Sequence, residues 1–127
     1  NPLAMAAARV TLTEILTDDA YAHFDGLRTM LVDGCERVIA EYGLSAYTVA
    51  LGAKGAVVFS PTPIRNYREF LEIDDRFSQA HWLFQHNGGV FLPPWGKTEQ
   101  WLISVQHDES DIDRLTANFA DFATAIS

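Results

Sequence analysis

Cysteine is nearly absent from this chain of 127 residues, and positive charge is scarce. The single cysteine, Cys35, has no partner for an internal disulfide. This favours a reducing compartment, and we expect a cytoplasmic protein. Nine lysine and arginine residues stand against seventeen acidic residues, which gives a formal net charge of −8. Nucleic acid and anionic membrane surfaces attract the opposite sign, so we expect neither as a partner.

Long apolar runs and histidine clusters are missing as well. No stretch approaches the roughly 20 apolar residues of a membrane-spanning helix, and no signal peptide is recognisable, so we expect neither in this protein. The four histidines are scattered, and we expect no metal site. Hydrophobic residues make up 48% of the chain and charged residues 20%. These values are ordinary for one globular domain.

The first part of the chain predicts two helices. Asn1 is a good helix cap, and Pro2 suits the first helical position because its missing N–H would be unpaired there anyway. Apolar residues then recur at helical spacing as far as Leu16. Residues 17–19 have the pattern of a stop followed by a new cap. The second helix then continues to Gly43, a typical helix-ending residue.

The pattern changes to that of strands after the second helix. Residues 47–51 and 55–60 are short runs rich in valine, alanine and aromatic residues, and the glycine-rich turn between them predicts a hairpin. The remaining chain predicts helices over 66–71 and 74–86, strands over 90–92 and 101–105, and a last helix that begins with a capping box of Asp108 and Asp111. The order predicts an α+β fold, with a small antiparallel or mixed sheet and helices on one face.

Most candidate reactive side chains favour a structural interpretation. His81 and His86 are five residues apart, so they lie on different helix faces, whereas a metal pair needs a spacing of three or four. Cys35 falls on the apolar stripe of its helix, as a buried inert thiol does. Ser60 and Ser104 have no obvious histidine and acid partners in the local sequence. The same structural interpretation applies to His107, to the pair Asp74–Asp75, and to the 52–55 turn, which lacks the spacing of a phosphate loop.

The segment from Leu92 to Trp101 is different. Two prolines, a glycine and two tryptophans surround Lys97, Glu99 and Gln100. Aromatic residues that flank polar ones are typical of the rim of a small-molecule site or of a protein interface. A purely structural loop is the alternative interpretation of the same residues.

Three motifs resemble those of class III pyridoxal-phosphate (PLP) aminotransferases. The opening Asn-Pro-Leu-Ala-Met-Ala-Ala-Ala is similar to the end of the family motif Gly-Thr-x-Ser-Gly-Asn-Pro-Leu-Ala-x-Ala-Ala. Residues 86–94 resemble its Gly-Val/Ile-aromatic-Leu-x-Pro segment, and residues 104–113 resemble its Ser-x-x-His ending with Asp-Ile-Asp. The glutamate-1-semialdehyde aminomutase branch matches best, over essentially the whole chain. The lack of arginine between residues 93 and 105 also favours that branch over the ornithine-like one.

The resemblance implies fold type I and places the chain in the C-terminal third of a homodimeric PLP enzyme. Such an enzyme transfers an amino group, or shifts it to the neighbouring carbon, on a small amino acid or amino ketone. Residues 1–17 would form the connector helix from the large PLP-binding domain, and residues 18–127 the small C-terminal domain. By the same resemblance, Asn1 and Pro2 would lie near the cofactor, and Glu99 and Gln100 would bind the substrate.

The resemblance also implies that this chain lacks the catalytic lysine. The family's Schiff-base lysine and phosphate-binding threonine precede the Asn-Pro motif, and neither Lys54 nor Lys97 lies in the lysine's motif. We therefore expect no catalytic residue here, an inactive chain, and weak or absent binding of PLP. We expect an exposed apolar surface along Met5, Leu12 and Leu16 where the large domain and the partner subunit dock.

Two other functions stay open at the level of the sequence. The chain could be a free-standing α+β module that binds a small ligand or a partner protein through residues 95–101. An enzyme that acts on its own ranks below both hypotheses, because the sequence has no convergent set of acid, base and nucleophile.

Overall fold

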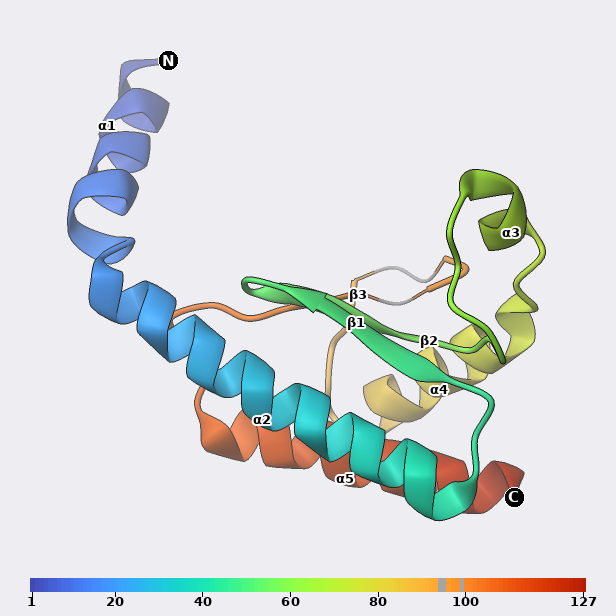
Figure 1. Cartoon of the computed structure of the whole chain (residues 1–127). Coiled ribbons are helices and arrows are strands. Elements are labelled where there is room, and N and C mark those ends of the chain that lie inside the picture. The colour runs from blue at the N-terminus through green and yellow to red at the C-terminus, as the bar shows by residue number, and fades with distance from the viewer. Residues whose placement is uncertain (94–95, 99) are drawn as a thin grey trace.

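The computed structural model describes residues 1–93, 96–98 and 100–127. Its elements follow in the order α1 (Pro2–Val10), the π-helical turn η1 (Thr11–Ile15), α2 (Asp18–Tyr42), β1 (Tyr47–Leu51), β2 (Lys54–Val58), α3 (Tyr67–Leu71), α4 (Asp75–Asn87), β3 (Gln100–Leu102) and α5 (Glu109–Ile126). Figure 1 shows α2 and α5 side by side below the sheet, with α1 projecting from one end of the molecule and α3 rising at the other. None of the helices among the described residues has the length and apolar character needed to cross a membrane.

The sheet is antiparallel, in the order β1-β2-β3. Val49 pairs with Ala56, and Gly55 pairs with Trp101. Gly52 has φ +55°, the left-handed conformation that glycine adopts readily, and this permits the tight turn of the hairpin. The α+β class with helices on one face of an antiparallel sheet, which the sequence predicts, is confirmed.

The helix ends confirm most of the predicted capping residues. The Thr17 side chain accepts a hydrogen bond from the backbone N–H of Ala20, and Gly43 ends α2 in the left-handed conformation. Asp108 and Asp111 form the predicted capping box at the start of α5. These local bonds satisfy N–H and C=O groups that a helix leaves unpaired at its ends.

The core lies between the sheet and the pair α2 and α5, which run in the same direction. At one end the ring of His23 contacts the carbonyl oxygen of His107 at 2.9 Å, and at the other Thr124 Oγ1 donates to Tyr42 Oη at 3.0 Å. The aromatic side chains of α5 and the end of β2 fill the middle, and they include Phe59, Phe119 and Phe122. Packed interiors of this kind supply most of the stability of a small domain.

Three local predictions were wrong in whole or in part. The strand expected over 101–105 is shorter, because β3 ends at Leu102 and the chain turns from there towards α5. Residues 90–92 form no strand, because the Val90 N–H donates to the carbonyl oxygen of Gln85 and completes the end of α4, with Gly89 at φ +82°. The first helix is not a single α-helix up to Leu16. Thr11 starts a π-helical turn, in which the Leu16 N–H reaches back five residues to the Thr11 carbonyl oxygen.

Candidate functional site

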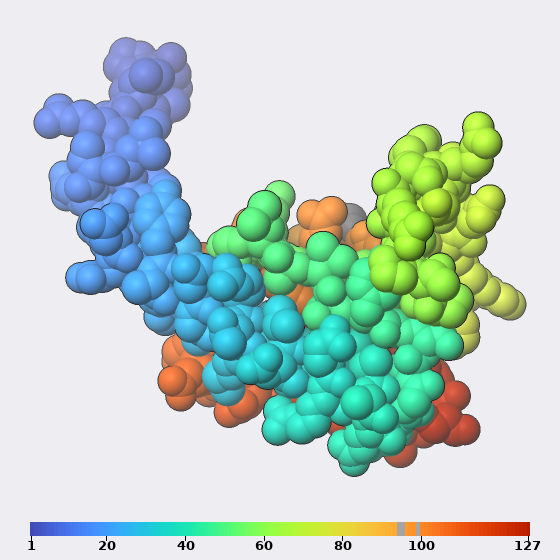
Figure 2. Space-filling view, in the orientation of Figure 1, coloured from blue at the N-terminus to red at the C-terminus, as the bar shows by residue number. Residues whose placement is uncertain are grey.

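The outer face of the sheet, opposite α2 and α5, has large apolar side chains on its surface. The residues of this face alternate along the strands with core residues, and they are Val49, Leu51, Lys54, Ala56, Gln100 and Leu102. Val49, Leu51 and Leu102 are 52%, 87% and 55% exposed. Figure 2 shows the molecule hollowed above this face, between the projecting α1 and the α3 segment. An exposed apolar face of this kind marks a binding or docking surface.

One end of the outer face forms a cavity against the α3 segment. Its volume is about 320 Å³, and its lining includes Tyr47, Val49, Ile64, Phe70 and Gln100. The backbone N–H of Ile64 donates to Tyr47 Oη at 2.8 Å, which ties the wall of the cavity to β1. Gln100, a predicted substrate-binding residue, is therefore an exposed polar side chain beside an apolar hollow.

The other predicted site residues lie elsewhere or outside the described residues. Glu99 belongs to the residues that the structure does not describe. Asn1 caps α1, where its Oδ1 accepts a hydrogen bond from the Leu3 N–H at 3.0 Å, and Pro2 occupies the first turn. Figure 1 shows the N-terminus at the far end of α1, which points away from the sheet. The structure thus does not bring Asn1 and Pro2 together with Gln100.

The predicted docking stripe on the first helix is exposed in part. Met5 and Leu12 are 69% and 68% exposed, and no residue of α1 is buried. Leu16, by contrast, packs against the core, because it lies where η1 meets α2. The exposed stripe on α1 therefore ends before Leu16.

The connection from α4 to β3 is held in place by contacts that sequence reasoning missed. Trp82 Nε1 donates to the carbonyl oxygen of Pro93 at 2.9 Å, and Ser78 Oγ donates to that of Lys97 at 2.8 Å. Lys97 Nζ donates to the carbonyl oxygen of Ile73 at 2.6 Å. The only signal in the sequence is the spacing of four between Ser78 and Trp82, which places both side chains on one face of α4.

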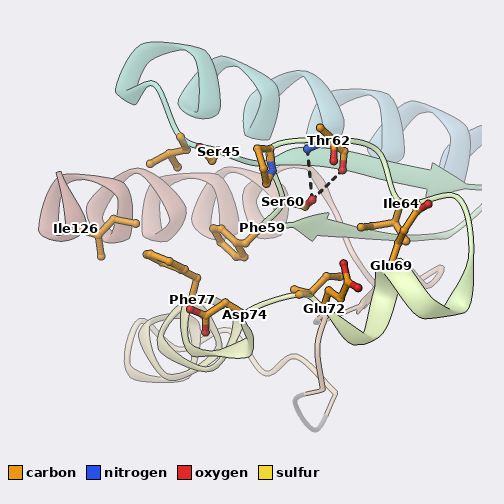
Figure 3. Close-up of a pocket in the computed structure, with 13 residues that line it drawn as sticks. Ser45, Phe59, Ser60, Thr62, Ile64, Glu69, Glu72, Asp74, Phe77 and Ile126 are labelled. Atoms are coloured by element: carbon orange, nitrogen blue, oxygen red, sulfur yellow. Dashed lines mark hydrogen bonds between the residues drawn. The ribbon is translucent and has the colours of Figure 1, made fainter.

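A second cavity, of about 440 Å³, opens between the ends of α2, β2 and α5 and the start of α4. Figure 3 shows Phe59, Phe77 and Ile126 on one side of it, with Asp74 next to Phe77, and the carboxylates Glu69 and Glu72 on the other side. Two of these carboxylates form hydrogen bonds that stabilise nearby turns and helix ends. Glu69 accepts from the Arg65 N–H and from Asn66 Nδ2, and Asp74 caps α4.

The charge of Asp74 is stabilised by a neighbour. Arg76 Nε donates to Asp74 Oδ1 at 2.9 Å, and hydrogen bonds from the Arg76 side chain and backbone lower the pKa of Asp74 to about 2. Asp75 lies next to it at the start of α4. The predicted interpretation of the pair as a helix cap is confirmed for Asp74.

The buried histidine and cysteine have structural surroundings. His81 is buried among aromatic rings of the core, and its Nε2 lies 3.1 Å from Gln85 Nε2. His86 instead packs against the ring of Trp82 at an angle of 40°, so the two histidines lie on different faces as predicted. Burial raises the pKa of the Cys35 thiol to about 12, which confirms an inert interior side chain. Among residues 1–93, 96–98 and 100–127, no three metal-ligating side chains gather.

Ser104 has a histidine partner, contrary to the sequence analysis. His107 Nδ1 accepts the Ser104 N–H at 2.9 Å and lies 3.1 Å from Ser104 Oγ. Ser104 Oγ in turn accepts from the Gln106 N–H. The nearby carboxylate of Asp108 is committed to the cap of α5. The chain reverses between β3 and α5, and this turn brings the two side chains together, so the contact stabilises a turn.

Comparison with known proteins gives sequence relatives along most of the chain. No protein-family model matches it. The chain is 35% identical over 114 residues to glutamate-1-semialdehyde 2,1-aminomutase from Desulfatibacillum aliphaticivorans, and 33% identical over 115 residues to that from Thermomicrobium roseum. These matches cover 89% and 90% of this chain but only 26% of each relative. The chain therefore spans about a quarter of the length of the curated relatives that it matches.

Solved structures also match most of this chain to about a quarter of a longer protein. A glutamate-1-semialdehyde aminomutase from Pseudomonas aeruginosa, in complex with PMP, matches with a TM-score of 0.87 and 25% identity over 96% of this chain and 27% of its own. A β-phenylalanine aminotransferase from Variovorax paradoxus, with a TM-score of 0.77 and 20% identity, shares the fold. The chain is thus homologous to the C-terminal quarter of the glutamate-1-semialdehyde aminomutases and the related class III aminotransferases.

Proposed function

We propose that this chain is the C-terminal domain of a PLP-dependent enzyme that transfers an amino group, or shifts it to the neighbouring carbon, on a small amino acid or amino ketone. The match to the Pseudomonas aeruginosa aminomutase over 96% of the chain carries this proposal. Because 114 matched residues make up 26% of the first relative, we expect about 300 further residues upstream in the gene. We place the enzyme in the cytoplasm as a homodimer.

The exposed apolar surfaces support a role in assembly. In our proposal residues 1–17 connect the two domains and residues 18–127 form the small domain. The α1 stripe with Met5 and Leu12, and the outer face of the sheet, would contact the large domain and the partner subunit. Burying such side chains gains roughly 25 cal/mol per Å² of apolar surface, which favours docking.

The lysines of this chain do not fit the cofactor's anchoring role. Lys97 Nζ already donates to the Ile73 carbonyl oxygen, and Lys54 lies exposed on β2. When bound, PLP supplies an electron sink for the bond that is broken next to the amino group. The anchoring amine of the proposed enzyme therefore has to come from outside this chain.

The substrate side is where this chain would contribute. In our proposal the Gln100 amide and the Glu99 carboxylate bind polar groups of the substrate, and the apolar outer face beside Gln100 excludes water. Asn1 and Pro2 would lie near the cofactor, at the junction with the large domain. These roles come from the family resemblance. The exposure of Gln100 beside a hollow supports its proposed role in binding substrate.

Absorbance and activity measurements on two proteins test the proposal. The complete gene product should bind PLP, with a spectrum unlike that of the free cofactor, and should convert glutamate 1-semialdehyde or transfer its amino group. The 127-residue chain should leave the spectrum of added PLP unchanged. A gene that starts at this chain, or a complete product with no amino-group chemistry on any small amino acid, would contradict the proposal.

One observation favours the alternative, a free-standing binding module. A hollow of about 440 Å³ lies beside the described part of the 95–101 segment, and its lining includes Lys54, Phe70, Lys97 and Gln100. This volume falls in the range of small-molecule sites. A gene that encodes only this chain would favour the module.

A further inference from the structure

Among the described residues, three hydrogen bonds that involve side chains tie the connection between α4 and β3 to the rest of the fold. Trp82 Nε1 holds the carbonyl oxygen of Pro93, and Ser78 Oγ holds that of Lys97. The third bond runs in the opposite direction, from Lys97 Nζ to the carbonyl oxygen of Ile73. Lys97 thus takes part in two of the three bonds, one through its backbone and one through its side chain.

The two bonds from α4 have the same spacing along the sequence at both of their ends. Ser78 and Trp82 are four residues apart and lie on one face of the helix, and the carbonyls that they hold are also four residues apart, at Pro93 and Lys97. Ser78 is fully buried. A buried donor that loses its acceptor is costly, so the bond from Ser78 strongly favours one position of the Lys97 backbone.

The side chain of Lys97 adds a contact that the helix alone cannot supply. Ile73 is buried and joins α3 to α4, so the 2.6 Å bond from Nζ links the connection to a second part of the fold. A hydrogen bond from an ammonium group is stronger than a neutral one. Arg76 and, to a smaller extent, Lys97 lower the pKa of Asp74, which indicates that the ammonium group also lies near this carboxylate.

We propose that Lys97 is a positioning residue for the substrate side of the active site. Its two bonds hold the backbone three residues before Gln100, the described residue that would bind substrate in the proposed function. This inference rests on the proposed function. Lys97 acts here through the backbone that it holds, and its amine takes no part in binding the cofactor.

Hydrogen exchange on the 127-residue chain tests the first half of the inference. Lys97→Met keeps the apolar stem and removes the donor, and we expect amides in residues 96–102 to exchange about tenfold faster. Lys97→Arg retains a cationic donor and should restore most of the protection. Lys54→Met removes the only other lysine, which is exposed, and is the matched control. Equal exchange in Lys97→Met and wild type, or the same acceleration in Lys54→Met, would overturn the proposal.

Steady-state kinetics of the complete gene product test the second half. We expect Lys97→Met to raise KM about tenfold and to change kcat less than twofold, because the loss concerns the binding of substrate. Lys97→Arg should return KM to within about threefold of wild type. Faster exchange without a change in KM would show that Lys97 holds the backbone but does not position substrate groups, and this overturns the inference. A wild-type product without amino-group chemistry would instead refute the proposed function, whatever the exchange result.

Discussion

The helices α1 and α2 follow each other in the chain and both carry regular apolar stripes, yet their surroundings differ completely. α2 buries eight residues against α5 and the sheet, whereas α1 buries none. Figure 1 shows α2 lying along α5 while α1 points away from the body. An apolar stripe thus predicts that a helix packs against another element. Only the tertiary structure shows whether that element lies within the same 127 residues.

The outer face of the sheet, like α1, carries apolar side chains that are exposed. Its Leu51 and Leu102 are exposed, while Trp101, on the opposite face of the same sheet, belongs to the core. In the proposed enzyme both exposed surfaces would be covered by the large domain and the partner subunit. The comparison between buried and exposed apolar surfaces can be tested by substitution.

The largest effect is expected from the interior of α5. Phe119→Ala should lower the free energy of unfolding by about 3–5 kcal/mol, because Phe119 is fully buried against other aromatic rings. Phe91→Ala is the matched control, since Phe91 is 83% exposed, and it should change the stability by less than about 0.5 kcal/mol. Urea denaturation measures both. Similar losses for the two variants would show that the core is not where the structure places it.

Two glycines in α2 should respond to alanine with smaller changes in stability, and the two changes should have opposite signs. A Cβ at Gly26 meets nothing within 4 Å, so Gly26→Ala should stabilise the chain by about 0.5–1 kcal/mol through helix propensity. A Cβ at Gly34 would lie 2.8 Å from Thr116 Oγ1 of α5, so Gly34→Ala should destabilise it by about 1–3 kcal/mol. Thermal unfolding of both variants measures the difference. Stabilisation by Gly34→Ala would mean that α2 and α5 are less closely packed.

Removal of residues 1–10 should change the stability of the isolated chain by less than about 0.5 kcal/mol, because α1 has no buried residue. The same chain without these residues should also self-associate less, since Leu3 and Met5 are exposed apolar side chains. Urea denaturation and sedimentation at several concentrations are the measurements. A large loss of stability would show that α1 packs against the body.

The smallest effect concerns a surface carboxylate. The pKa of Asp74 is about 2, below its ordinary value of 3.8, chiefly because of hydrogen bonds from Arg76. A lowered pKa means that the stabilisation is present above pH 4 and is lost as the pH falls towards 2. Asp74→Asn should therefore be slightly less stable than wild type at pH 6, and the difference should shrink as the pH falls and vanish below about pH 2. Asp75→Asn is the control, and a constant difference between wild type and Asp74→Asn at all pH values would contradict the assignment.

The features that the sequence predicted correctly depend on neighbours in the chain. The caps at Thr17 and Asp108 and the stop at Gly43 need only residues within a turn, so their patterns are sufficient. The strand expected over residues 90–92 was wrong because a strand needs a neighbour, and the Val90 N–H is used by the end of α4 instead. The bond from Ser78 to Lys97 joins residues 19 apart, and no local pattern predicts it.

For the candidate site too, some features were predicted from the sequence and others required the structure. The motifs that resemble the class III enzymes were visible in the sequence, and homology to their C-terminal quarter is confirmed. That Gln100 lies beside an apolar hollow, and that Lys97 bonds to Ile73, required the structure. The roles of Asn1, Pro2, Glu99 and Gln100 stay predictions.

The sequence by itself determined the boundaries of the helices after the first, the hairpin and the family resemblance, because these depend on periodicity, on capping side chains and on motifs of consecutive residues. Only the tertiary structure decided which apolar stripes are buried and which stay exposed. Burial depends on the meeting of segments distant in the chain. In this chain α2 packs along α5, whereas α1 buries no residue, and the outer face of the sheet meets the α3 segment at one end while its Leu51 and Leu102 stay exposed.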